Sequence, residues 1–205
     1  MCGRYTANTE DEVIEIRSIL AGLSMRLSNH GIRRESDLAA EHDRIFTDIY
    51  GKEIFPSGTA PVITNSGDII LSKWGFDKWD GKGLVINARS ETAGSSRFFS
   101  PYAQKSRCII PASHYFEWKK EPKQSAVKYR LGVKCSSGIY MAGLLNKEKN
   151  NYVIMTKQAA ESIGFIHDRM PVLLLSSQVV SWLNGTLDLS ALLTLMPDDI
   201  YYETA

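Results

Sequence analysis

Short β-type runs separated by turn residues dominate the chain from Phe55 onward, and this texture limits the fold more than any other feature. Pro56 and Pro61 interrupt helix formation there, and turn signals such as Asp80-Gly81 separate several of the runs. We expect strands over Val62–Thr64, Ile69–Trp74, Cys108–Ile110, Val127–Val133, Ile139–Leu144 and Tyr152–Thr156. Strands at this spacing could close on themselves into a barrel-like core.

Helical patterns lie on both sides of this β-rich middle. We expect a helix after the capping-box pattern Thr9–Glu12, a second between Ser36 and Gly51, and short helices over Gln158–Gly164, Ser176–Asn184 and Leu189–Met196. Neither an internal repeat nor a Pro/Gly/Ser-rich linker divides the chain. The sequence therefore predicts a single α+β domain over residues 1–205, with a mainly antiparallel β-core flanked by helices.

Several classes of protein are excluded by simple patterns. No apolar run approaches the roughly 18–20 residues of a membrane span, and the N-terminus carries no apolar signal region. The three cysteines form no C-x-x-C pair, and the four histidines show no H-x-x-x-H spacing. A disulfide scaffold or a structural zinc site has little to build on, so we expect a protein of the reducing cytoplasm.

Charge is distributed unevenly along the chain. Residues 71–134 hold 13 Lys and Arg against 5 Asp and Glu, whereas the segments before and after hold 7 against 11 and 4 against 7. A basic middle between acidic ends suggests a local surface for a polyanion. On charge alone the alternative stays open, namely a few solvated lysines on a β-surface.

Cys2 is a candidate nucleophile because of its position. Aminopeptidases remove Met1 when the second residue is small, so we expect Cys2 to carry both a free α-amine and a thiol. The amine has an ordinary pKa of about 7.7–8.0 and the thiol about 8.5, so both are partly nucleophilic at neutral pH. Such a 1,2-aminothiol condenses with an aldehyde to an imine, which the thiol then closes to a thiazolidine ring. The alternative is a frayed terminus with an incidental cysteine.

Two polar clusters could supply further functional groups. Asn87 offers donors and an acceptor beside Arg89, whose planar fork suits phosphate, although a polar loop with an Arg89–Glu91 ion pair explains the same residues. His167 precedes Asp168-Arg169 near a proline-fixed turn, which is a better setting for function than a lone core histidine. Asp168-Arg169 could equally cap and staple that turn.

Glu117 lies between two aromatic residues, Phe116 and Trp118. In a poorly hydrated pocket its pKa would rise toward the range useful for general acid–base catalysis. Alternatively, it lies on the polar face of a strand and pairs with Lys119 or Lys128. Taken alone, the residues favour this second interpretation.

Taken together, the clusters resemble one known family. The chain carries, in this order, Cys2-Gly3-Arg4-Tyr5, Trp74-Gly75, Asn87-Ala88-Arg89-Ser90-Glu91-Thr92, Arg107-Cys108-Ile109-Ile110-Pro111-Ala112, Tyr115-Phe116-Glu117-Trp118 and His167-Asp168-Arg169-Met170-Pro171. This set closely resembles the SRAP family, the SOS response-associated peptidase proteins that process abasic sites in DNA. The resemblance runs from Cys2 to about Asn184 and implies a single SRAP-like domain.

The resemblance implies a covalent reaction with abasic sites in single-stranded DNA. In that reading Cys2 is the nucleophile and reacts with the ring-opened sugar aldehyde through both its amine and its thiol. Asn87 matches the asparagine that hydrogen-bonds at the linked centre, and Glu117 the carboxylate that handles protons during imine formation and ring closure. His167 matches the histidine linked to opening of the sugar and to reversal of the crosslink. Neither a metal nor an organic cofactor is implied.

The resemblance also implies residues that contact DNA. Arg4, Arg89 and Arg169 match phosphate-binding arginines, and Trp74 matches a tryptophan beside the DNA groove, where an aromatic ring can stack on a base. The expected partner is single-stranded DNA with abasic sites, bound by a monomer that associates with the nucleoid at damaged DNA. The segment Phe76–Trp79 departs from the family pattern, which affects this DNA-binding rim and leaves the four reactive positions unchanged.

Two other functions remain as alternatives. A thiol autopeptidase would remove its own leader, as the family name suggests. A non-covalent nucleic-acid-binding module would use the basic middle and bind reversibly, in a salt-sensitive way that depends neither on Cys2 nor on abasic sites. Lyase activity, by β-elimination from the imine, would accompany the crosslinking reaction rather than compete with it.

Overall fold

The computed structural model of the chain describes residues 2–14, 16, 44–120, 125–134, 136, 138–195, 197 and 199–205. Its centre is a sheet in the order β13-β12-β4-β3-β8-β11-β14, and β11 also pairs with β12. The closed ring of strands consists of β3 (Thr59–Thr64), β4 (Ile69–Trp74), β8 (Arg107–Ala112), β11 (Ile139–Asn146) and β12 (Asn151–Gln158). The expected barrel-like closure is therefore confirmed.

Most strand pairs of the barrel are antiparallel, as the sequence predicts. The exceptions in this sheet involve β12, which runs parallel to β4 and to β7 (Asn87–Arg89). Three short strands, β13 (Arg169–Pro171), β14 (Leu173–Leu174) and β7, extend the sheet at β12 and β11. The parallel β7–β12 pair is important for the site, because it places Asn87 opposite Ile154.

A second sheet lies beside the barrel and contains the start of the chain. Its order is β15-β10-β9-β1-β2, with every pair antiparallel. Its strands are β1 (Tyr5–Thr6), β2 (Glu53–Ile54), β9 (His114–Lys119), β10 (Val127–Val133) and β15 (Ile200–Thr204). Strand β1 thus lies between two strands that follow much later in the sequence, and this fixes the position of the preceding residues.

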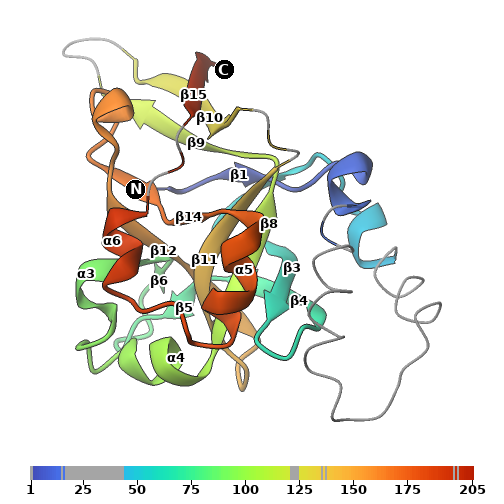
Figure 1. Cartoon of the computed structure of the whole chain (residues 1–205), viewed down its shortest axis with the longest axis vertical. Helices are drawn as coiled ribbons and strands as arrows, with labels where there is room; N and C mark the ends of the chain where they lie inside the picture. Colours follow the sequence, from blue (N-terminus) through green and yellow to red (C-terminus); the bar gives the residue numbers. More distant parts are fainter. Residues whose placement is uncertain are drawn as a thin grey trace.

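Short helices surround the barrel. They are α3 (Ser90–Ala93), α4 (Ser100–Lys105), α5 (Ser176–Leu183) and α6 (Ala191–Thr194). Figure 1 shows β9, β10 and β15 at the top of the view and α3, α4 and α5 lower down. A hairpin of β5 (Phe76–Asp77) and β6 (Leu84–Val85) extends from the barrel. Among the described residues no helix is long and apolar enough to cross a membrane.

Most predicted elements are present, and one is largely wrong. Each predicted strand falls within an observed strand, and the predicted helix Ser176–Asn184 matches α5. The predicted helix Gln158–Gly164 is reduced to a 3-10 turn at Glu161–Ile163, since Gln158 still belongs to β12. Residues 10–14 and 44–47 are helical, and the first half of the predicted helix between Ser36 and Gly51 lies outside the described residues.

Alternation along the barrel strands divides the core into two clusters. In β8, Cys108 and Ile110 pack in the cluster that contains Cys2, Tyr5 and Trp74, while Ile109 packs on the opposite side. The opposite cluster includes Trp182 of α5 and Leu192 of α6. The barrel wall is therefore apolar on both faces, and the Cys2 cluster is the one shared with the second sheet.

Candidate active site

Cys2 is held just before β1 and is fully buried, with 0% of its surface exposed. Its thiol donates a long hydrogen bond to the Arg4 carbonyl oxygen, with Sγ and O 3.7 Å apart. Burial, followed by the nearby Glu117 charge, raises the pKa of the thiol well above its usual range. At neutral pH the sulfur is therefore a protonated thiol that needs a base before it can attack.

Asn87 of β7 contacts Cys2 directly. Its Nδ2 donates a hydrogen bond to the Cys2 carbonyl oxygen at 2.9 Å. The segment is fixed from the other side, because the indole N–H of Trp74 donates to the Ile86 carbonyl oxygen at 2.9 Å. Within the described structure, the buried Oδ1 of Asn87 makes no hydrogen bond. That oxygen remains available as an acceptor beside Cys2.

Glu117 of β9 is a buried carboxylic acid, with only 3% of its surface exposed. Burial raises its pKa from the ordinary 4.5 to about 7. The predicted alternative pairs Glu117 with Lys119 or Lys128. Instead, Lys128 Nζ lies 2.7 Å from Glu53 Oε1 and over the Phe116 ring, and Lys119 Nζ lies over the Phe165 ring. The poorly hydrated setting is therefore the one observed, and Glu117 can both donate and accept a proton near neutral pH.

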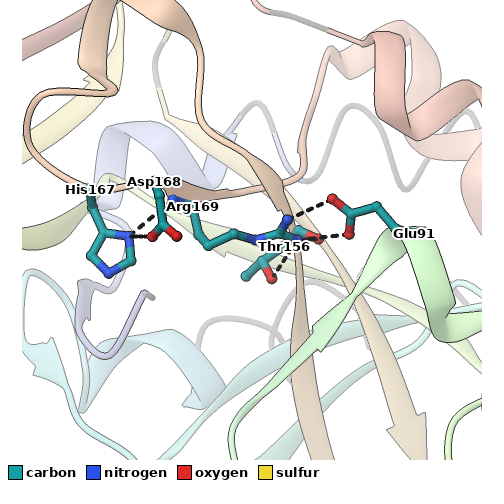
Figure 2. A network of polar contacts seen from close by, with 5 residues as sticks. All are labelled: Glu91, Thr156, His167, Asp168 and Arg169. Carbon is teal, nitrogen blue, oxygen red and sulfur yellow. Dashed lines mark hydrogen bonds and ion pairs between the residues drawn. The ribbon is translucent and has the colours of Figure 1, made fainter.

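His167 precedes β13 and is oriented by its neighbours (Figure 2). The backbone N–H of Arg169 donates to His167 Nδ1 at 3.0 Å, and Asp168 Oδ1 lies 2.8 Å from the same nitrogen. Burial lowers the pKa of the imidazole, which favours the neutral ring at pH 7. With Nδ1 accepting, the ring proton is on Nε2; once Nδ1 is protonated, Asp168 is its acceptor.

Arg169 braces this turn. Its guanidinium forms a two-pronged ion pair with Glu91 of α3, at 2.6 and 2.8 Å, and also donates to the Thr156 carbonyl oxygen at 2.8 Å. The ion pair considered between Arg89 and Glu91 is therefore not the one observed. Because both prongs of the Arg169 guanidinium bind the Glu91 carboxylate, Arg169 positions the His167 turn in this structure and does not present a free guanidinium to phosphate.

The other predicted DNA contacts differ in accessibility. Arg89 is exposed, whereas Arg4 is partly buried, paired with Glu53 at 3.2 Å and stacked on the Phe55 and Trp118 rings. Trp74 is fully buried, and its ring centroid lies 5.3 Å from that of Tyr5 and 6.4 Å from that of Tyr152. Its ring is not available to a base in this conformation, because packing and the indole hydrogen bond commit it to the core.

Sequence reasoning missed an exposed aromatic residue five positions after Trp74. Trp79, in the β5–β6 hairpin, is 87% exposed, and its ring stacks on Phe98 with centroids 6.3 Å apart. Lys78 and Lys82 flank it in the sequence. A tryptophan between lysines beside the turn Asp80-Gly81 is the signal that could have identified it.

The structure brings the predicted reactive residues together to different degrees. Asn87 bonds to Cys2, and the Glu117 charge acts on the Cys2 thiol. His167 is linked less directly, through the Asp168 charge, which acts on Glu117. No group of three metal-binding side chains occurs among the residues described. The site combines a buried thiol, an amide that fixes the adjacent backbone and a carboxylic acid that titrates near pH 7.

Comparison with known proteins relates the chain to a family. The model of the SOS response associated peptidase (SRAP) family matches residues 1–202. A Bacillus subtilis abasic site processing protein, YoqW, is 31% identical over 192 residues, covering 90% of this chain and 80% of YoqW. The Escherichia coli abasic site processing protein YedK is 36% identical over 119 residues, which is 54% of this chain and 52% of YedK.

A solved structure supports the fold. A crystal structure of a protein from Bacteroides thetaiotaomicron superposes with a TM-score of 0.75 at 22% sequence identity, covering 99% of this chain and 91% of that one. A protein from Bordetella bronchiseptica gives a TM-score of 0.69 at 20% identity, covering 100% of this chain and 99% of that one. At these identities the likeness concerns the fold alone.

Proposed function

This chain belongs to the SOS response associated peptidase (SRAP) family, and we propose that it crosslinks Cys2 covalently to abasic sites in single-stranded DNA. The observation that carries the proposal is the contact of Cys2 with Asn87 beside a buried Glu117 whose pKa is about 7. The names of its relatives, abasic site processing proteins, support the substrate class. The proposal requires removal of Met1, so that Cys2 carries the free amine.

The first step joins the Cys2 amine to the substrate. The deprotonated amine attacks the aldehyde carbon of the ring-opened abasic sugar and forms a carbinolamine. Protonated Glu117 then donates its proton to the carbinolamine hydroxyl, which leaves as water and yields a protonated imine. Asn87 holds the Cys2 carbonyl, so the adjacent amine keeps a fixed direction during the attack. This step leaves Glu117 as a carboxylate.

The second step closes the ring. The Glu117 carboxylate takes the proton of the Cys2 thiol, and the sulfur bonds to the imine carbon. The electron pair of the C=N bond moves to nitrogen, giving a neutral thiazolidine and restoring the Glu117 acid. A group with a pKa of about 7 suits both proton transfers, because neither form is rare near neutral pH.

His167 has a role before these steps. The closed sugar must open to expose its aldehyde. The imidazolium form of His167, whose Nδ1–H donates to Asp168, can give its Nε2 proton to the ring oxygen and return to the neutral ring, while the anomeric hydroxyl loses its proton to water. The reverse transfer would assist reversal of the crosslink. Arg169, held by Glu91, keeps the imidazole in place and so acts as a positioning residue.

DNA recognition in this proposal combines charge and stacking. Exposed Arg89 follows Asn87 within two residues, so a phosphate next to the abasic sugar would lie within its reach. Trp79 takes over the stacking role that the sequence assigned to Trp74, because its ring is exposed. A single Cys2 suffices for the reaction, so we propose that a monomer acts.

The test is a denaturing gel of the purified protein with a single-stranded oligonucleotide that carries one abasic site. Mass spectrometry first verifies that Met1 is absent. We expect a heat-stable band of lower mobility that is lost in Cys2→Ala and does not form with intact DNA. Cys2→Ala retains an N-terminal amine, so it should still form a hydrolysable imine and cleave the strand by β-elimination. If the processed protein binds DNA reversibly and forms no such band, it is a non-covalent binding module.

A further inference from the structure

One polar side chain beside Cys2 has no part in the steps above. Tyr115 lies in β9 two residues before Glu117, so both side chains extend from the same face of the strand. Its cross-strand neighbour in β1 is Tyr5, and it packs in the buried cluster that contains Cys2. Tyr115 is 0% exposed. The topology therefore directs a phenol toward the region that Cys2 and Glu117 share.

The hydroxyl of Tyr115 is buried and makes no hydrogen bond within the described part of the chain. A buried hydroxyl without a partner is destabilising and uncommon. Two other tyrosines of the same cluster are fully buried, and their hydroxyls bond to each other: Tyr5 and Tyr152, at 2.5 Å. Among the fully buried tyrosines of this cluster, the unpaired hydroxyl is therefore particular to position 115, although buried serine hydroxyls at positions 72, 90 and 106 also make no hydrogen bond among the described residues.

The electrostatic surroundings keep Tyr115 a donor. Burial, followed by the charges of Cys2 and Glu117, raises the pKa of its phenol well above the usual range. It therefore stays protonated throughout the working pH range. The contact of the Cys2 thiol is the carbonyl oxygen of Arg4, which accepts hydrogen bonds and cannot stabilise negative charge on sulfur.

Ring closure is the step that needs such a donor. As Glu117 removes the thiol proton, negative charge develops on a sulfur that is enclosed by apolar side chains. We propose that the Tyr115 hydroxyl donates a hydrogen bond to Cys2 Sγ during attack on the imine, and so accelerates ring closure specifically. The proposal rests on the proposed crosslinking function. The phenol keeps its proton throughout. Its hydrogen bond to sulfur lasts until formation of the C–S bond removes the negative charge from sulfur. A donor that is unpaired at rest stabilises the transition state without stabilising the resting thiol.

The experiment separates imine formation from ring closure. Wild type or Tyr115→Phe, with the protein in excess, is mixed with abasic single-stranded DNA, and samples are taken over time. Borohydride traps the imine and so measures the total adduct, whereas heating alone leaves only the ring-closed, heat-stable adduct. We expect Tyr115→Phe to form total trapped adduct at the wild-type rate, and heat-stable adduct about tenfold more slowly. The longer-lived imine should also give more strand cleavage. Removal of an unpaired buried hydroxyl should leave Tm unchanged or raise it.

Tyr152→Phe is the matched control, because it removes a buried hydroxyl that has a partner. It should lower Tm and leave the ratio of the two adducts unchanged. The Tyr115 proposal is overturned if Tyr115→Phe closes the ring at the wild-type rate. It is also overturned if both adducts slow equally, which indicates a packing role. Failure of the crosslinking function itself would look different, since wild type would then form no heat-stable adduct.

Discussion

Replacement of Glu117 by Gln should make the protein more stable and less active, and the size of the stability change can be worked out from the site. Glu117 has a pKa of about 7 in the folded protein against an ordinary value of 4.5. Between these two pH values the unfolded chain loses a proton that the folded chain keeps. The folded state is therefore progressively destabilised as the pH rises through this window, and the loss is complete above the folded pKa.

The magnitude follows from the pKa difference. At about 1.4 kcal/mol per pH unit, the wild type should lose about 3 kcal/mol of its free energy of unfolding between roughly pH 4.5 and pH 7. Glutamine has nearly the shape of the protonated acid and does not ionise, so Glu117→Gln should not show this loss. For a chain of this length the difference at pH 8 corresponds to about 6–12 °C in Tm.

Urea unfolding at pH 4, 6 and 8 measures this difference. We expect wild type and Glu117→Gln to have similar stability at pH 4 and to diverge as the pH rises, with Glu117→Gln the more stable. Heat-stable crosslink formation should fall by about 100-fold in Glu117→Gln, because both proton transfers lose their carrier. The pH dependence of the wild-type rate should change near pH 7 and disappear in Glu117→Gln. If the free energies of unfolding of wild type and Glu117→Gln change with pH in parallel, Glu117 is not a buried acid with a raised pKa.

Two further substitutions test how the site is held and reached. Asn87→Ala removes the hydrogen bond to the Cys2 carbonyl and should slow crosslinking by about tenfold at saturating DNA, with little change in the Kd for an intact oligonucleotide. Single-turnover gels measure the rate and fluorescence anisotropy measures the Kd. A change confined to the Kd would contradict a positioning role. Trp79→Ala removes an exposed ring and should weaken binding of intact single-stranded DNA by about 1–3 kcal/mol while leaving Tm unchanged. A Trp79→Phe control should retain most of the affinity. If Trp79→Ala binds as tightly as wild type, stacking by Trp79 is excluded.

The fold was predictable where the sequence pattern and burial agree. The run Ile139–Leu144 is apolar throughout and belongs to β11, which is buried along nearly its whole length. Strand β9 was considered only as a polar-faced alternative for Glu117 and was absent from the predicted strands, because Tyr115, Phe116 and Glu117 are all buried and show no apolar–polar alternation. The parallel pairing of β7 with β12 could not be predicted from the sequence either, because a three-residue strand is too short to show a periodicity.

The site shows the same division. Cys2 and Glu117 were identifiable from their chemistry and neighbours, yet Phe116 and Glu117 extend from opposite faces of β9, so the adjacent ring does not form the setting of the carboxyl group. Trp74 and Arg169 matched family motifs, but residue type alone does not reveal that a ring is enclosed by Tyr5 and Tyr152, or that a guanidinium is bound by Glu91. Exposure and pairing are tertiary properties, so these roles required the structure.

The position of β1 between β2 and β9 has a consequence for the timing of biosynthesis. Its partners Ile54 and Tyr115 are about 50 and 110 residues further along the chain. At roughly 5–20 residues per second, on the order of ten seconds pass between synthesis of the first residues and synthesis of β9. During this interval β1 lacks its β9 partner, so the segment around Cys2 remains accessible to enzymes. Once β9 has been made and the sheet forms, Cys2 is enclosed, so processing that exposes its amine is easiest before that point.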